Sequence, residues 1–330
     1  MNLGRQFAFL LGIKYNKNFF SATNYADHLY QGSRSIKDPQ VNNFLQSNVH
    51  NKNYDDNWNM QNTFVNEFSE WLELDFSHFD ADYSAGTTQS FDSFYLRHRE
   101  KKFRCYVGEY FYHLKTWISN NIDWEFITEE NPLKSGDVLV ISYPFCDTGN
   151  FYDITKILSD CELHNIPVLI DMAYYCLTDT PQIDFNFDCI DTISFSLSKI
   201  FPVANYRIGV RYTKKDIEDG QKLHHNINYN NYASCFIGYS LINNFSKNYI
   251  ANEYRNKQQK VCEYFNLKQS DSVIFSVGDE SWKKYSRETL LKEYKLNYPS
   301  DLFVNRICLN SVFENWKLFE KMTNEFNFEI

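Results

Sequence analysis

The sequence predicts an α/β fold in which a mainly parallel sheet is flanked by helices. Residues 138–143, V-L-V-I-S-Y, are a short apolar run of the kind found in strands buried on both faces. Residues 152–164 repeat apolar side chains at helical spacing, and two further apolar runs follow at 168–170 and 193–196. Alternation of strand, helix and strand is typical of parallel strands joined by crossover helices, so we expect helices on both faces of the sheet.

The segments that precede this core are more polar. Residues 14–62 are rich in Asn, Asp, Ser and Tyr, which predicts loops with one short helix. Residues 63–73 place large apolar side chains on one stripe and predict an amphipathic helix. The small residues of 82–90 predict a turn that leads into another helix, and 103–107 is a short strand candidate.

The segments that follow the core predict one more strand, a helical region and a smaller unit. Residues 208–212 are apolar and β-branched, and 216–267 have helical composition. Near the end, F-V-N-R-I-C-L-N at 303–310 predicts a strand, followed by a helix over 313–326. We expect this last segment to form a smaller α/β domain built on the larger one.

Composition limits the kind of protein. The 330 residues carry a net charge of −9 without a dense run of Lys or Arg, which argues against nucleic acid as a partner. The eight cysteines are scattered, with no C-x-x-C pair, so we expect reduced thiols, no metal site and a cytoplasmic location. The apolar run at 7–11 is too short to span a membrane and lacks the cleavage site of a signal peptide, so no membrane partner is expected.

Three kinds of chemical group follow the predicted strands and the turn. Asp171 ends the strand V-L-I-D, and Lys199 follows the strand that reads I-S-F-S. Gly86 stands at the start of a helix. In open α/β sheets ligands bind beyond the carboxyl ends of the strands, so we expect these residues to share one edge of the sheet.

These groups match the chemical needs of pyridoxal 5′-phosphate. A desolvated lysine forms a Schiff base with an aldehyde, and an aspartate facing a pyridine nitrogen keeps that nitrogen protonated. Phosphate binds at a helix N-terminus and to hydroxyl and guanidinium donors. The candidate phosphate ligands are Gly86, Thr87, Thr88, Ser196, Ser198 and Arg207.

Each residue also has an ordinary structural interpretation. Lys199 alone could be a surface lysine, and Asp171 alone could cap a helix. Tyr110 could be a core or surface tyrosine, and Arg306 could make a salt bridge on an edge strand. The order and spacing of the motifs are more specific than any one of these residues.

In that order and spacing the sequence resembles the fold-type I pyridoxal-phosphate enzymes, in the class I/II aminotransferase branch. D-M-A-Y at 171–174 and S-L-S-K ending at Lys199 are similar to family motifs, and Arg207 follows that lysine at the family spacing. A-G-T-T at 85–88 resembles the turn before the first helix. Y-P-F-C-D-T-G at 143–149 resembles the family's N-P-x-N-P-T-G, with Cys146 in place of an asparagine that touches the ring oxygen. One hydrogen bond to the cofactor is therefore missing or supplied otherwise.

The resemblance implies a role for each site residue. Lys199 holds the cofactor and moves a proton, and Asp171 pairs with the pyridine nitrogen. Tyr174 donates to the ring oxygen, Tyr110 stacks on the ring, and Arg306 binds the substrate α-carboxylate. Tyr54 is a weaker candidate for reaching the phosphate of a neighbouring subunit.

The resemblance also implies an architecture and a reaction. It implies a seven-stranded sheet in a cofactor-binding large domain over 61–230, and an N-terminal arm with part of the small domain over 1–60. It implies an inter-domain helix and the C-terminal small domain over 231–330. It implies a homodimer, for which the aromatic, Asn-rich stretch 226–236 is a candidate contact. An aminotransferase acting on an amino acid and a 2-oxo acid is expected. A lyase, decarboxylase or synthase using the same cofactor, and a non-catalytic scaffold, remain alternatives.

Overall fold

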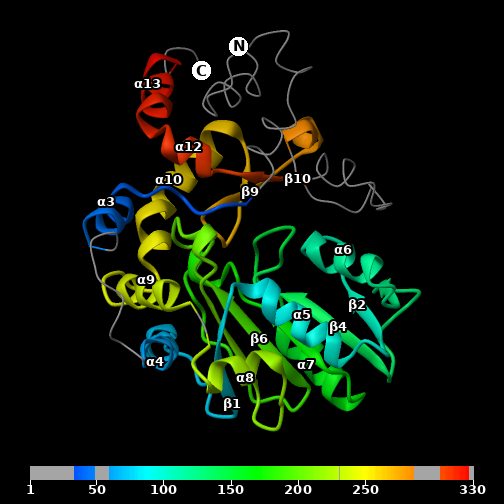
Figure 1. Cartoon of the computed structure of the whole chain (residues 1–330). Helices are drawn as coiled ribbons and strands as arrows, with labels where there is room; N and C mark the ends of the chain where they lie inside the picture. The colour runs from blue at the N-terminus through cyan, green and yellow to red at the C-terminus, as the bar shows by residue number, and fades with distance from the viewer. Residues whose placement is uncertain (1–32, 49–58, 230, 286–304, 327–330) are drawn as a thin grey trace.

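The computed structural model describes residues 33–48, 59–229, 231–285 and 305–326, and its largest element is a seven-stranded sheet (Figure 1). The strands lie in the order β1-β7-β6-β5-β4-β2-β3. Strand β7 runs opposite to the other six strands of this sheet, because it pairs antiparallel with both β1 and β6 while the remaining pairs are parallel. Their bounds are β1 Phe79–Ser84, β2 Lys102–Cys105, β3 Trp124–Phe126, β4 Asp137–Ser142, β5 Val168–Asp171, β6 Ile190–Ser196 and β7 Gly209–Lys214.

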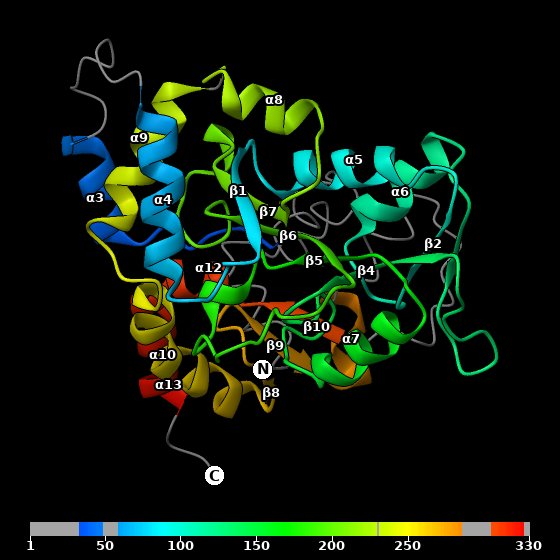
Figure 2. The ribbon, with the colours of Figure 1, turned by 90° about the horizontal axis from the view of Figure 1, so that it is seen from below.

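Helices cover both faces of this sheet. Figure 2 shows α5, α6 and α8 on one face and α7 on the other. Every residue of β4, β5 and β6 is buried, as expected of strands that are covered on both sides. The four helices are α5 Thr87–Arg97, α6 Phe111–Ser119, α7 Ile154–Leu163 and α8 Gly220–Asn226.

A helix pair closes the β1 edge. Helix α4 (Met60–Leu72) packs on α9 (Tyr232–Ile242) and against β1. Phe64, Phe68 and Leu72 are fully buried on the apolar stripe of α4. Gly238 of α9 allows this close packing, because a Cβ atom there would lie 2.6 Å from the Phe64 ring.

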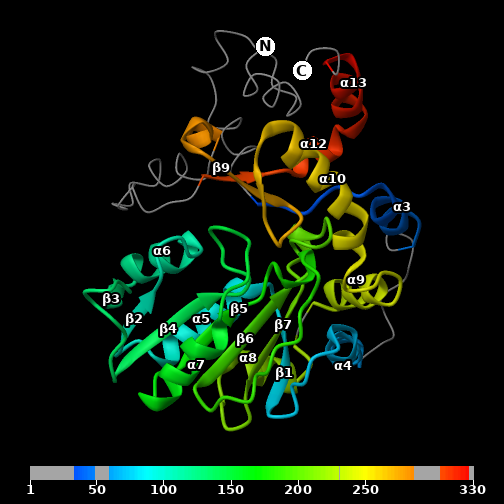
Figure 3. The ribbon, with the colours of Figure 1, turned by 180° about the vertical axis from the view of Figure 1, so that it is seen from behind.

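A second, antiparallel sheet lies beyond the carboxyl ends of the parallel strands (Figure 3). It consists of β8 (Lys268–Gln269), β9 (Phe275–Gly278) and β10 (Asn305–Cys308). The remaining helices are α3 Pro39–Asn48, α10 Tyr249–Phe265, α12 Asn310–Glu314 and α13 Trp316–Phe326, with short 3-10 turns at Tyr175–Leu177, Ala204–Tyr206 and Glu280–Tyr285.

The segment before α3 joins this second unit. The Arg34 guanidinium pairs with Glu314 of α12, with 2.8 Å between Nη2 and Oε2. The Asp38 carboxylate accepts a hydrogen bond of 2.9 Å from the Tyr254 hydroxyl of α10. These contacts place residues 33–38 beside the C-terminal helices.

Most predicted elements appear within a few residues of their expected positions, and two findings differ. Strand β7 runs antiparallel, because a loop over 197–208 joins it to β6 in place of a crossover helix. Strand β1 occupies part of the predicted 82–90 turn. The polar Asp82 does not fit the apolar pattern of a buried strand, but its carboxylate is buried in an ion pair with Arg211. None of the helices in the described ranges is long and apolar enough to cross a membrane. The proposed domain boundaries stay a prediction.

Candidate active site

The register of the large sheet aligns the polar residues that end its strands. Ser142 of β4 pairs with Asp171 of β5, and Asp171 pairs with Ser194 of β6. Two residues further along β6, Ser196 pairs with Gly209, which also pairs with Ser84 at the end of β1. The loops that leave these strands therefore emerge along one edge, below the second sheet.

A small cavity opens at this edge, and it gathers the predicted cofactor residues. Ten of the twelve predicted site residues line this cavity. The other two each touch a lining residue: Gly86 lies against Arg207, and Arg306 contacts Cys146. Two residues that were not predicted, Ala173 and Ala204, complete the lining. The predicted lining residues are Thr87, Thr88, Tyr110, Cys146, Asp171, Tyr174, Ser196, Ser198, Lys199 and Arg207.

Gly86 and Arg207 form one wall of the cavity. Gly86 precedes α5 with a φ of +78°, and a Cβ atom there would lie 2.4 Å from Arg207 Nη2. Arg207 donates from the same nitrogen to the Thr88 hydroxyl over 2.9 Å. Among the described residues, no side chain caps the start of α5, which leaves N–H groups of its first turn available to an anion.

Two serines form the adjoining wall. The Ser196 hydroxyl lies 2.9 Å from the Ser198 hydroxyl, and it accepts the backbone N–H of Ser198 over 3.1 Å. This local turn holds both hydroxyls at the cavity, next to Arg207. Helix N–H groups, four hydroxyls and a guanidinium are a donor set suited to a phosphate.

Asp171 lies at the base of the cavity with its side chain buried. Burial raises the pKa of its carboxyl to about 7, although the Ala173 N–H bond and the nearby Lys199 amine oppose the increase. Within the described part of the chain, the hydrogen bond to this carboxylate comes from the Ala173 N–H over 3.0 Å. A carboxylate in this setting gains a favourable partner if a protonated nitrogen binds beside it.

Lys199 reaches a segment that sequence reasoning missed. Its Nζ donates to the Ser33 carbonyl oxygen over 2.7 Å. The Ser33 hydroxyl is hydrogen-bonded to the Tyr174 hydroxyl, so one residue contacts two predicted catalytic side chains. Burial lowers the pKa of the Lys199 amine, and the nearby Arg306 guanidinium contributes to the decrease. Ser33 and Lys199 are far apart in the sequence, and no motif links them. They meet because the segment before α3 runs past the cavity.

Arg306 enters the site from β10. Its side chain is only 3% exposed, and its guanidinium carbon lies 4.3 Å from the centre of the Phe275 ring. Nη1 donates to the Cys146 carbonyl oxygen and lies 3.8 Å from the Cys146 sulfur. Nε is buried without a hydrogen-bond partner, and within the described ranges no carboxylate forms a salt bridge with this guanidinium. A buried cation of this kind favours an anionic ligand.

Tyr110 and Cys146 line the cavity from two different loops. Tyr110 directly precedes α6 and its ring is stacked on Tyr112, with centroids 6.0 Å apart. Cys146 is almost fully buried, and its backbone N–H donates to the Ser142 hydroxyl over 2.7 Å. Tyr54, the candidate for a neighbouring subunit's phosphate, lies outside the described residues.

The residues present fit pyridoxal 5′-phosphate on three observations. Because Gly86 has no Cβ atom, the backbone before α5 lies directly against the Arg207 guanidinium, beside the hydroxyl donors of the cavity. Asp171 is a buried carboxylate that a protonated ring nitrogen would stabilise. Arg306 presents a buried guanidinium toward the same cavity wall.

Comparison by sequence gives no relative. A scan against models of protein families finds no match, and a search of curated proteins finds none. The fold, in contrast, has counterparts among solved structures.

Three of these structures illustrate the range. The histidinol-phosphate aminotransferase from Clostridium acetobutylicum matches with a TM-score of 0.59 and 16% identity, over 90% of this chain and 99% of that one. The PLP-bound C-S lyase from Staphylococcus hominis matches with a TM-score of 0.63 and 11% identity, over 91% of each chain. The L-threonine-O-3-phosphate decarboxylase from Porphyromonas gingivalis matches with a TM-score of 0.56 and 14% identity, over 88% of this chain and 99% of that one.

These likenesses show the fold. The chain has the fold of the fold-type I pyridoxal-phosphate enzymes, with a seven-stranded, mainly parallel sheet flanked by helices. The predicted fold class is therefore confirmed. The neighbours carry out different reactions on the same framework, so the reaction of this chain has to be argued from its own residues.

Proposed function

We propose that this chain binds pyridoxal 5′-phosphate through Lys199 and is an aminotransferase. One observation carries the proposal: an amine, a buried carboxylate and a phosphate-type donor set meet in a single cavity. When bound, the cofactor withdraws electrons from the α-carbon of an amino acid through its protonated ring.

The residues of the chain have distinct tasks in this proposal. Thr87, Thr88, Ser196, Ser198 and Arg207 hold the phosphate together with the first turn of α5. Asp171 binds the ring nitrogen in its ionised form, and this pairing stabilises the positive charge of the nitrogen. The Tyr174 hydroxyl donates toward the ring oxygen, and Tyr110 covers one face of the ring.

Lys199 is the proposed covalent ligand and proton carrier. Because burial lowers the pKa of its amine, a larger fraction of the amine is neutral and nucleophilic near neutral pH than in an exposed lysine. When a substrate amine takes its place on the cofactor, the freed Lys199 amine would accept a proton from the substrate α-carbon. It would then return this proton to the cofactor. Arg306 binds the α-carboxylate and thereby orients the substrate.

A lyase or decarboxylase is a second candidate, and Cys146 favours it. The related family has an amide at this position, whereas here the backbone carbonyl of Cys146 is engaged with Arg306 and the side chain is a thiol. A thiol is a weak hydrogen-bond donor, so the ring oxygen depends more on Tyr174. Solved structures with this fold include a C-S lyase and a decarboxylase.

A product assay separates these candidates. The protein loaded with cofactor is incubated with each common L-amino acid, with and without 2-oxoglutarate. Release of the corresponding 2-oxo acid only when the acceptor is present supports an aminotransferase. Release of ammonia, hydrogen sulfide or carbon dioxide without an acceptor supports the second candidate. No turnover of any donor, by a protein that holds the cofactor, favours the non-catalytic scaffold.

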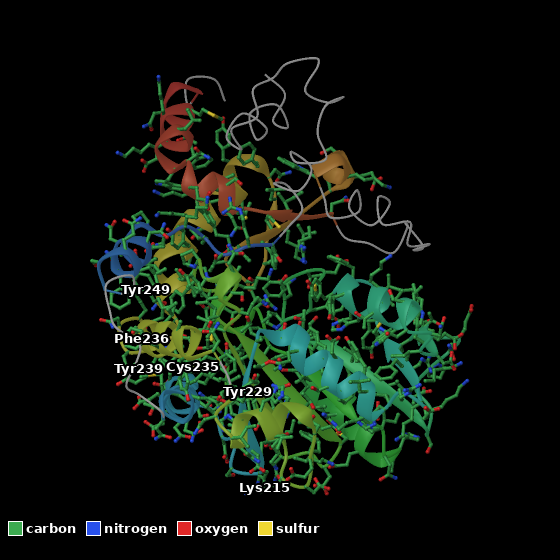
Figure 4. All side chains as sticks on the ribbon, viewed as in Figure 1. Lys215, Tyr229, Cys235, Phe236, Tyr239 and Tyr249 are labelled. Carbon is green, nitrogen blue, oxygen red and sulfur yellow. The ribbon has the colours of Figure 1, made fainter. Side chains whose placement is uncertain are left out.

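We further propose a homodimer in a reducing, cytoplasmic location. Ile227 and Tyr229 are 54% and 72% exposed in the predicted contact stretch. In Figure 4, Phe236 and Tyr239 lie together at the left side of the molecule, and Tyr229 lies nearer the middle. The eight cysteines, all within the described residues, form no disulfide with one another, as is usual in proteins of reducing compartments. Light scattering of the wild type and of Tyr229→Asp tests the dimer, which the substitution is expected to weaken.

A further inference from the structure

The buried carboxylate of Glu109 lies directly beside the proposed site, yet none of the roles above uses it. Glu109 is only 1% exposed and precedes Tyr110 in the turn after β2. Burying a carboxylate is costly unless its oxygens accept hydrogen bonds. Both oxygens accept from Ser142: Oε1 from the backbone N–H over 2.9 Å, and Oε2 from the hydroxyl.

A continuous series of hydrogen bonds leads from Glu109 to the second sheet. The Ser142 hydroxyl donates to Glu109 and accepts the Cys146 N–H over 2.7 Å. The Cys146 carbonyl then accepts from Arg306 Nη1. The Tyr152 hydroxyl fixes the same strand end by donating to the Ser142 carbonyl over 2.9 Å.

The two loops that carry this series are also in direct contact. Gly108 has a φ of +104°, and a Cβ atom there would lie 2.6 Å from the Asp147 Cβ. The loop that bears Tyr110 therefore packs against the loop that bears Cys146. A displacement of either loop would be transmitted to the other.

We infer that Glu109 is a positioning residue, which fixes the 142–146 turn and, through the Cys146 carbonyl, the Arg306 guanidinium. A carboxylate suits this task because it has only acceptors. It directs the Ser142 proton toward itself and leaves the lone pairs of that hydroxyl for the Cys146 N–H. A glutamine would present an N–H donor to the same hydroxyl and weaken this order.

The part of this inference that concerns substrate binding rests on the proposed function, whereas the part that concerns the turn does not. The experiment therefore has two readouts. In the first, cofactor-free protein is treated with iodoacetamide and the labelling rate of Cys146 is measured by mass spectrometry. In the second, the KM and kcat of the cofactor-loaded protein are measured with an active amino-acid donor.

Glu109→Ala is expected to raise the Cys146 labelling rate by about tenfold, because the turn opens locally more often. Ser142→Ala is expected to act similarly, and the double variant is expected to match Glu109→Ala, because both residues act in one series. Glu109→Gln, which keeps the shape, is expected to lie between Glu109→Ala and the wild type. It also serves as the test if Glu109→Ala does not fold.

Asp191→Asn is the matched control, because it removes a buried carboxylate at the opposite end of β6. It is expected to leave Cys146 labelling unchanged. In the second readout, Glu109→Ala is expected to raise KM by about tenfold with a smaller change in kcat.

Two results would overturn the inference. One is wild-type Cys146 labelling in both Glu109 variants. The other is an equal rise in labelling in Asp191→Asn, which would indicate general destabilisation. A wild type that binds no pyridoxal phosphate would overturn the proposed function, and the labelling result would still decide the role of Glu109.

Discussion

Gly86 and Arg207 lie so close together that one added methyl group would occupy the space of the guanidinium. The Cβ atom of an alanine at position 86 would be 2.4 Å from Arg207 Nη2, and the φ of +78° is one that side chains with a Cβ rarely adopt. The two residues come from distant parts of the chain: Gly86 precedes α5 and Arg207 precedes β7. Their contact forms the wall that we assign to the phosphate.

Gly86→Ala is therefore expected to weaken binding of pyridoxal phosphate by at least about tenfold, because Arg207 must move away. Gly136→Ala provides a matched control, since Gly136 also has a positive φ, of +95°, but a Cβ atom there meets nothing within 4 Å. The dissociation constant is measured by cofactor absorbance. An equal loss in both variants would mean that backbone strain alone is responsible.

Arg306→Met is expected to raise the KM for an amino-acid donor by about 100-fold, because the carboxylate loses its buried bidentate partner. Cofactor affinity is expected to change much less, since Arg306 contacts the cavity through Cys146. Arg255→Met, on α10, removes a cation that pairs with Asp179 and is expected to leave KM unchanged. A normal KM in Arg306→Met would assign carboxylate binding to another group.

Asp171 makes the stability of the cofactor-free protein depend on pH. Burial raises the pKa of this carboxyl to about 7, from an ordinary value of 3.8. Its protonated form contributes stability that is complete below pH 3.8 and is lost as pH rises through about 7. Asp171→Asn cannot ionise, so its Tm is expected to exceed that of the wild type by about 5 °C at pH 8, and by less at pH 5. A Tm difference that is the same at both values would contradict this assignment.

The stability contributed by the ion pairs of Arg97 is expected to depend on pH in the opposite direction, so that it is lost at low pH. Arg97 pairs with Asp191 and Asp219, both over 2.6 Å. Burial raises the pKa of each carboxyl, but other contacts outweigh this effect. The His98 hydrogen bond and the Arg97 charge lower the pKa of Asp191 to about 2. The hydrogen bond and charge of Arg211, with a smaller contribution from Arg97, lower the pKa of Asp219 to about 2. The stability they contribute is present above pH 3.8 and is lost as pH falls through about 2.

Arg97→Met is accordingly expected to lower the free energy of unfolding by about 3 kcal/mol at pH 7, and by clearly less at pH 3. Urea unfolding at the two pH values measures this difference. Arg99→Met removes an exposed partner of Glu100 and is expected to cost less than about 0.5 kcal/mol at either pH. A cost for Arg97→Met that does not depend on pH would indicate lost packing instead of lost charge.

The sequence was sufficient to predict the central strands and the cavity residues. Apolar runs identified β4, β5 and β6, because strands buried on both faces contain few polar residues. The motif residues at positions 171 and 199 follow such strands, so their meeting at one edge follows from parallel topology.

Other features could not be predicted because they depend on polar contacts between residues that are far apart in the sequence. The acidic residues of β1 are Asp80 and Asp82, which pair with Lys222 and Arg211 far along the chain. Ser33 meets Lys199 across 166 positions without any repeating pattern. No spacing in the sequence connects Glu109 with Ser142, so their contact could only be found in three dimensions.

The central claim is that Lys199 forms a covalent bond with pyridoxal phosphate. The direct test is mass spectrometry of peptides from the protein after incubation with the cofactor and reduction with borohydride, beside Lys199→Ala. We predict a single pyridoxyl adduct on Lys199 of the wild type and none in the variant, with the other lysines unmodified. A folded wild type, saturated with cofactor and carrying no adduct on Lys199, would contradict the account.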